Sequence, residues 1–327
     1  MTDTWTWATV TQASPLRIKV DGDTSALDAT TGDLVGSLAV DDRVRVHLHS
    51  DGILVTGIQG GGNRSNPNLL INSNFMVNQR GAASGASLSS GDYFLDRWMA
   101  RAANAHYTWT TTPHGQPVTL GVDGGAYSMI RQTVERQNVP ADDYTLSWEG
   151  GAILRVYNAG GTAPTFTGNE TSPITVTLDG TDDVRVEAFG TGESVGKVKL
   201  ERGTVATPHT LQRYDEELAA CQRYYWRSRN VSSNEALAFG MAAGSTTLRA
   251  IFHAPVEMRA QPTLTAAALN INDYASNRAV TSATISGVYS GTQTFQVEAA
   301  TTGLTAYRPG ILQKSGADSY LAFDAEM

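Results

Sequence analysis

Residues 144–157, YTLSWEGGAILRVY, show the pattern that decides the fold. Polar and apolar residues alternate over residues 144–148, and a second strand-like stretch covers residues 153–157 after a turn that contains two glycines. Because successive side chains of a β-strand point to opposite faces, this pattern predicts two short strands, each with one buried face.

The same pattern recurs through the middle of the chain. Alternating stretches cover residues 107–111, 174–178, 184–189 and 197–200, and turns rich in threonine and glycine separate them. Such spacing suits two packed antiparallel sheets. We therefore predict a β-sandwich of the jelly-roll type over residues 68–207.

Residues 1–62 form a second strand-rich segment. Alternation covers residues 4–10, 16–20 and 43–49, an apolar stretch follows at 52–58, and Asp-Gly pairs supply turn chemistry. Four or five short strands in so short a segment predict a small OB-like barrel. Residues 63–67 end a glycine-rich stretch and are predicted to be a linker.

The texture changes after the predicted sandwich. Residues 211–226 contain no glycine or proline, which predicts a helix within residues 208–228. Five residues recur there at spacings of three and four: Leu211, Tyr214, Leu218, Cys221 and Tyr225. This stripe spans two heptads and leaves two arrangements open, a trimeric coiled coil built on the stripe or a single helix packed on the sandwich.

Residues 229–327 return to strands and predict a C-terminal β-sandwich. The fold class predicted for the whole chain is therefore all-β: an OB-like barrel, a jelly-roll-type sandwich, a short helix and a second sandwich. If the helical stripe is a three-fold interface, the assembly is an elongated homotrimer.

Composition excludes several functions. The 327 residues carry a net charge of −8 and no dense cluster of lysine and arginine, which argues against nucleic-acid partners and adhesion to anionic membranes. The single cysteine excludes an intramolecular disulfide and a cysteine-rich zinc site. The sequence has no apolar run long enough for a membrane span, so no membrane insertion is predicted. The N-terminus lacks the features of a Sec signal, and we therefore expect the protein to be made in the cytoplasm.

Several segments resemble a known family. Residues 68–75 (NLLINSNF), 79–81 (QRG) and 96–98 (DRW) resemble the opening of a domain in tail proteins of tailed bacteriophages. Members of that family read N-L-L-x-N-G-x-F, then Q-R-G, then A-D-R-W. Here Ser73 replaces the usual glycine and Leu95 the small residue. Residues 200–208 (LERGTVATP) and 216–225 (EELAACQRYY) are similar to the end of that domain.

The two ends of the chain extend the resemblance. Residues 252–259, 262–264 and 323–327 look like the last module of such tail fibres, and residues 14–18 and 41–46 are similar to an N-terminal module of minor tail proteins in actinobacteriophages. The resemblance implies a virion protein of the distal tail, a tail fibre or receptor-binding protein that is usually a homotrimer. Residues 1–62 would then contact other tail-tip proteins, and residues 229–327 would form the receptor-binding tip.

Motifs for catalysis and metal binding are incomplete, which predicts a protein that is not an enzyme, with no catalytic residue, metal or cofactor. Gly192 to Gly196 match the G-x-S-x-G elbow, but a strand is predicted after them where that motif needs a helix. His47 and His49 have no evident third metal ligand. No spacing ties two carboxylates together as a glycosidase requires, although calcium held by scattered carboxylates stays open.

Glycan binding suits the sequence better, because sugar sites often pair an aromatic face with hydrogen-bonding side chains. The predicted contacts to a host cell-surface glycan are Tyr274, Arg278, Tyr289, Tyr307 and Trp148. The trimer interface would be the five-residue stripe. Three alternatives remain: a structural tail-tip connector without receptor contact, a soluble lectin-like carbohydrate-binding module, and a polysaccharide-cleaving enzyme without a known motif.

Overall fold

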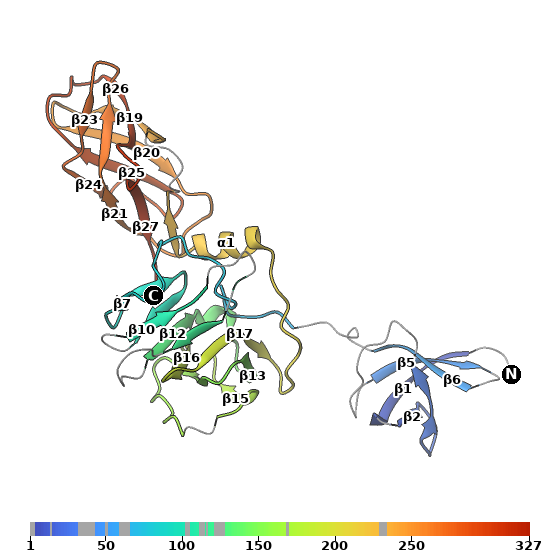
Figure 1. Cartoon of the computed structure of the whole chain (residues 1–327). Helices are drawn as coiled ribbons and strands as arrows, with labels where there is room; N and C mark the ends of the chain where they lie inside the picture. Colours follow the sequence, from blue (N-terminus) through green and yellow to red (C-terminus); the bar gives the residue numbers. More distant parts are fainter. Residues whose placement is uncertain are drawn as a thin grey trace. The chain divides into compact units, whose positions relative to one another are not determined.

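The structure is a computed structural model and describes residues 4–13, 15–31, 43–49, 52–58, 66–101, 105–110, 115, 117–120, 128–167, 170–228 and 234–327. Strands make up 49% of it and helix 4%, which confirms the all-β class with one short helix. The chain divides into two compact units (Figure 1), Met1–Pro67 with Thr207–Thr210, and Asn68–Ala206 with Leu211–Met327. Most of the predicted linker, residues 63–65, lies outside the described residues.

The first unit is one six-stranded sheet in the order β3-β2-β1-β5-β6-β4. Ala8 pairs with Val20 on one side and Val44 on the other, so one face of the sheet collects small and branched apolar side chains. The strands are β1 (Thr4–Ala13), β2 (Leu16–Val20), β3 (Leu27–Asp28), β4 (Thr30–Thr31), β5 (Arg43–His49) and β6 (Gly52–Ile58).

The second unit begins with two sheets that share one core. Their orders are β15-β13-β17-β11-β10-β7 and β14-β16-β12-β9-β8, and Leu146, Leu200, Leu154 and Val186 meet between them. The strands are β7 (Ser87–Leu88), β8 (Tyr93–Leu95), β9 (Trp98–Ala100), β10 (Ala105–Thr108), β11 (Val118–Leu120), β12 (Ser128–Val134), β13 (Asp142–Glu149), β14 (Ile153–Asn158), β15 (Ile174–Leu178), β16 (Val184–Gly190) and β17 (Ser194–Arg202).

The predicted helix is shorter than expected. α1 covers Tyr214–Gln222, its first turn carries three acidic residues that suit the positive end of a helix dipole, and the chain then tightens as the Tyr224 N–H donates to the Cys221 carbonyl. β18 (Tyr225–Arg227) follows at once and pairs with β27. The helix ends before the stripe is complete because the segment after it pairs with β27 and begins with Tyr225 and Trp226, large aromatic residues that favour strands.

The remaining strands build a C-terminal lobe from two sheets around a second core. The orders are β18-β27-β21 and β23-β22-β26-β19-β20-β25-β24, and the rings of Phe295 and Phe323 pack in a tilted arrangement between them, with centroids 4.9 Å apart. The strands are β19 (Ala236–Ala242), β20 (Thr247–His253), β21 (Thr263–Ala267), β22 (Leu269–Asn272), β23 (Asn277–Ala279), β24 (Ser282–Ile285), β25 (Thr294–Ala300), β26 (Pro309–Lys314) and β27 (Tyr320–Asp324).

Candidate functional site

Three of the five predicted glycan contacts meet at one end of the C-terminal lobe. Tyr274 lies two residues after the end of β22, Arg278 lies in β23, and Tyr307 lies two residues before the start of β26. β22 pairs with both β23 and β26, which brings these loops to the same edge. A contact of 3.4 Å from the Arg278 guanidinium to the Thr302 carbonyl ties the β25–β26 loop to β23.

Both tyrosines of this end, which we call the tip, are held outward by their backbone. Tyr274 and Tyr307 are 75% and 76% exposed, with φ of 66° and 64° in the left-handed region that non-glycine residues seldom adopt. The Tyr274 N–H donates to the Asn272 side chain at 2.8 Å, and the Tyr307 N–H donates to the Ala242 carbonyl at 2.8 Å. Such constrained residues cluster at binding loops.

The base of the tip is ionic. Arg278 pairs with the buried carboxylate of Asp273 at 3.4 Å. Hydrogen bonds from the Ser276 and Ala275 N–H groups, together with Arg278, lower the pKa of Asp273 below its usual value. Asp273 therefore stays ionised and fixes the loop that carries Tyr274. The tip thus offers two exposed aromatic rings on a rigid base.

The other two predicted contacts lie elsewhere. Tyr289 is exposed in the β24–β25 loop, at the opposite end of β25 from Tyr307. Trp148 is only 7% exposed; it packs in the sandwich core and donates its indole N–H to the Ala152 carbonyl at 2.8 Å. Because its ring is enclosed by the sandwich, the structure does not place Trp148 on a surface where a sugar could stack.

The predicted trimer stripe is split in the same way. Leu211 and Tyr214 are about half exposed, and Leu218 is partly buried. Cys221 and Tyr225 are buried inside a single chain, and burial raises the pKa of the Cys221 thiol well above its usual value. Both side chains are thus covered within their own chain, which leaves Leu211, Tyr214 and Leu218 as the accessible part of the stripe; the trimer interface itself stays a prediction.

The family-like motifs join the sandwich to the C-terminal lobe. Arg97, at the β8–β9 turn with φ of 71°, is buried and pairs with Glu326. Its guanidinium donates to the Thr133 carbonyl at 2.6 Å and lies 3.5 Å from the ring centroid of Tyr224. One side chain of the D-R-W motif therefore contacts the sandwich, the segment after α1 and the segment after β27.

Arg80 of the Q-R-G motif makes a parallel set of contacts. It pairs with Asp324 at 3.1 Å and Glu326 at 3.3 Å, and it lies 3.8 Å from the ring centroid of Tyr225. Planar guanidinium groups suit such combined pairing and stacking better than ammonium groups do. We call Arg80, Arg97, Asp324 and Glu326 the ionic lock.

The lock rests on a buried polar layer. Asn72, with φ of 54°, donates to the carbonyls of Val77 and Asp96, and its own carbonyl accepts the Trp98 indole N–H at 2.9 Å. Asp96 accepts from the Gln79 N–H at 2.6 Å. Burial raises the pKa of Asp96 to about 7, although the hydrogen bonds from Gln79 and the charge of Arg80 act in the opposite direction.

Two side chains with possible catalytic chemistry, Ser194 and Glu187, lie in the part of the chain that the structure describes. The G-x-S-x-G motif begins between β16, which ends at Gly190, and β17, which begins at Ser194, so a strand follows where the nucleophile elbow needs a helix, as predicted. Glu187 is buried but bound by Arg131 and Arg155. Burial alone would raise the pKa of Glu187; the two arginines outweigh it and lower the pKa, which is the wrong direction for a general acid.

Groups of metal-ligating side chains and long apolar helices are both absent from the described residues. No three His, Cys, Asp or Glu side chains gather there into a group that could hold a metal ion. His49, which the sequence analysis considered with His47 as a metal-ligand pair, has a side chain outside the described part of the structure. No helix in this described part has the length and apolar character to cross a membrane.

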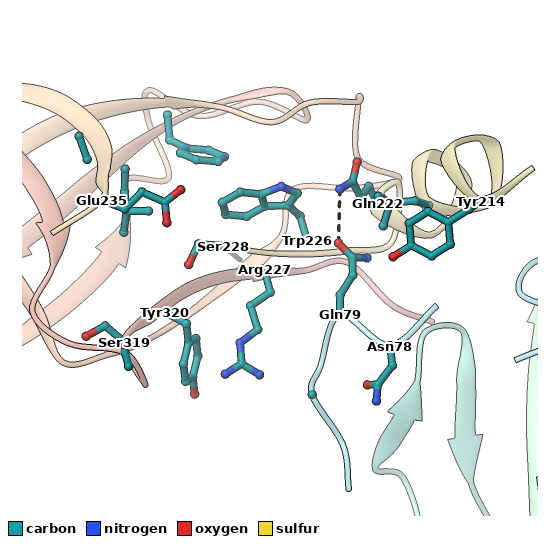
Figure 2. Close-up of a pocket in the computed structure, with 16 residues that line it drawn as sticks. Asn78, Gln79, Tyr214, Gln222, Trp226, Arg227, Ser228, Glu235, Ser319 and Tyr320 are labelled. Atoms are coloured by element: carbon teal, nitrogen blue, oxygen red, sulfur yellow. Dashed lines mark hydrogen bonds between the residues drawn. The ribbon is translucent and has the colours of Figure 1, made fainter. Parts of the chain in front are cut away.

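A pocket of about 710 Å³ opens beside the ionic lock, and no sequence pattern pointed to it. α1, β18, the Gln79 segment and the β26–β27 turn line it, with Trp226, Gln222, Tyr214 and Tyr320 in its wall (Figure 2). The available signal was the aromatic run of residues 224–226, which the sequence analysis included in the predicted helix, with Tyr225 in the trimer stripe. In comparisons with known proteins, no family model matches the chain and no curated protein matches it.

Proposed function

We propose that this protein is a tail fibre or receptor-binding protein of a tailed bacteriophage, which binds a host cell-envelope glycan without catalysis. The observation that carries the proposal is the tip, where Tyr274 and Tyr307 stand exposed on fixed loops around the ion-paired Arg278. Aromatic faces next to hydrogen-bonding groups are what a pyranose ring needs, and loops on a rigid sheet are where recognition resides.

The proposed assembly places this tip at the distal end of the virion tail. Residues 1–62 would be the OB-like module that attaches to other tail-tip proteins, and the jelly-roll-type sandwich would support the C-terminal lobe. A homotrimer would present three tips together. Because each tip offers little area, avidity from several simultaneous contacts would supply most of the binding strength.

The test measures binding of the fluorescently labelled full-length protein to cell walls from a panel of actinobacteria, the hosts that the resemblance suggests. Replacing both Tyr274 and Tyr307 by alanine should weaken binding about tenfold or more, because two aromatic contacts are lost. Tyr289→Ala alters an equally exposed tyrosine at the other end of the sheet and should have little effect.

Each other outcome selects an alternative. If no cell wall retains the protein, the connector reading replaces receptor binding. If oligosaccharides appear in the supernatant, the protein is an enzyme. If only Tyr289→Ala reduces binding, the site lies at the opposite end of the lobe.

A further inference from the structure

We infer that the pocket between α1 and β18 binds an uncharged sugar residue, as a second glycan subsite separate from the tip. This inference rests on the proposed glycan-binding function. The volume of about 710 Å³ lies within the range of small-molecule sites. Its wall combines four aromatic side chains with the amide of Gln222, the pairing of apolar faces and hydrogen-bonding groups that a sugar ring requires.

Trp226 is the anchor of this pocket. Its ring packs on Phe252 and Phe323, with centroids 4.7 and 5.8 Å away, so its orientation is set by the core of the lobe. The rest of the indole is partly exposed toward the pocket (Figure 2). Among the residues that the structure describes, no hydrogen-bond acceptor is recorded for its N–H, which leaves that donor to a ligand.

The amides beside Trp226 are already oriented. Gln79 donates to the Tyr225 carbonyl at 2.8 Å and to Asp96 at 3.1 Å, and its oxygen accepts from Gln222 at 3.4 Å (Figure 2). Since Gln79 is fixed by two partners, Gln222 is fixed through it. The Gln222 Oε1 atom, for which no donor is recorded in the described part of the chain, can then accept from a ligand hydroxyl.

The two ionic side chains in the wall already have partners within the protein. These side chains are Arg227 and Glu235. Arg227 lies 4.1 Å from the ring centroid of Tyr320 and donates to the Arg80 carbonyl, while Glu235 pairs with Lys314 at 2.7 Å. A neutral sugar can enter without disturbing the contacts of Arg227 or the Glu235–Lys314 ion pair, so we expect a neutral sugar to be preferred over a charged one.

The experiment measures dissociation constants for the full-length protein by ligand-observed NMR and calorimetry. The probes are galactose, rhamnose and N-acetylglucosamine, with galacturonic acid and glucosamine as charged counterparts. At least one neutral sugar should bind in the millimolar range. Trp226→Phe keeps the packing on Phe252 but removes the N–H, and Gln222→Met removes the amide; each should raise Kd about three- to tenfold.

Trp109→Phe is the matched control, because Trp109 is another partly buried tryptophan of the same unit, packed on the sandwich core away from the pocket. Its Kd should equal that of the unaltered protein. The inference is overturned if no neutral sugar binds, if a charged sugar binds more tightly than its neutral counterpart, or if Trp226→Phe and Gln222→Met leave Kd unchanged. It is also overturned if these variants alter native mass instead of Kd.

The two proposals fail separately. The alanine variants of Tyr274 and Tyr307 should lose cell-wall binding but keep millimolar sugar binding in the pocket. If cell-wall binding depends on the tip while no neutral sugar enters the pocket, the subsite is absent and the proposed function stands. If neither cell walls nor sugars bind, both proposals fail.

Discussion

At the scale of single residues, Arg97 connects the sandwich to the C-terminal lobe through a buried ion pair. Arg97→Met removes the partner of buried Glu326 and the stack on Tyr224, so unfolding free energy should fall by about 3 kcal/mol, as for other broken buried ion pairs. Arg213→Met breaks the exposed pair with Asp215 and should cost less than about 1 kcal/mol. Urea unfolding measures the free energy of unfolding of both variants. Equal decreases for Arg97→Met and Arg213→Met would show that the buried ion pair of Arg97 does not stabilise the fold.

Asp96 makes stability depend on pH. Its pKa is about 7 in the folded protein against the ordinary aspartate value of 3.8, so between these values the folded state binds more protons than the unfolded state. Unfolding free energy therefore falls as pH rises from about 4 to 7, by at most roughly 4 kcal/mol.

Asp96→Asn tests this assignment because it cannot titrate. The stability of the unaltered protein relative to Asp96→Asn should decline across that interval and level off above it. Asp318→Asn, a change at an exposed carboxylate, should leave the decline in place. A rise or a flat difference with pH would contradict the assignment.

At the scale of elements, β27 is the strand on which the C-terminal lobe depends, since it pairs with both β18 and β21. Phe323 is fully buried there against Phe252 and Phe295, so Phe323→Ala should lower unfolding free energy by about 3–5 kcal/mol. Phe239→Ala makes the same change in β19, where the ring is 67% exposed, and should cost less than about 0.5 kcal/mol. Thermal unfolding distinguishes the two variants, and similar midpoints would refute the placement of β27.

At the scale of the whole molecule, the prediction is a native mass near 105 kDa, three times the 34.9 kDa chain, measured by light scattering. If the mass is near 34.9 kDa, the protein is a monomer without avidity in solution, and the lectin-like module and the structural connector become the favoured hypotheses. Leu218→Asp tests the stripe. If this variant is monomeric, α1 belongs to the trimer interface; if it remains trimeric, the subunits contact one another through other surfaces.

The ionic lock also determines how the function should be dissected. Residues 68–206 and 211–327 form one unit, so deleting residues 229–327 would remove Asp324 and Glu326 and leave Arg80 and Arg97 buried without partners. Loss of binding in such a deletion would report misfolding as much as a missing tip. Point variants of the tip and pocket are therefore the sharper tools.

Alternation of side chains determined the fold class by itself. Residues 247–252 alternate between a buried and a more exposed face, and residues 144–148 and 184–189 do so except that Thr145 and Glu187 are also buried. A local pattern was therefore enough to predict these strands. The turn at Gly192 was likewise fixed locally, by a strand on each side of it. The composition by itself gave the net charge of −8 and the single cysteine, which rules out an intramolecular disulfide.

Only the tertiary structure decided where the helix ends and which aromatic rings remain available. Tyr225 fits a helical stripe in sequence, yet pairing with Asp324, almost a hundred residues away, makes it part of a strand. Trp148 and Tyr274 are both aromatic residues near turns, and the packing of distant strands buries one and exposes the other. The partners of Arg97 and the walls of the pocket come from segments far apart in the chain, and contacts of that kind leave no periodic trace in a sequence.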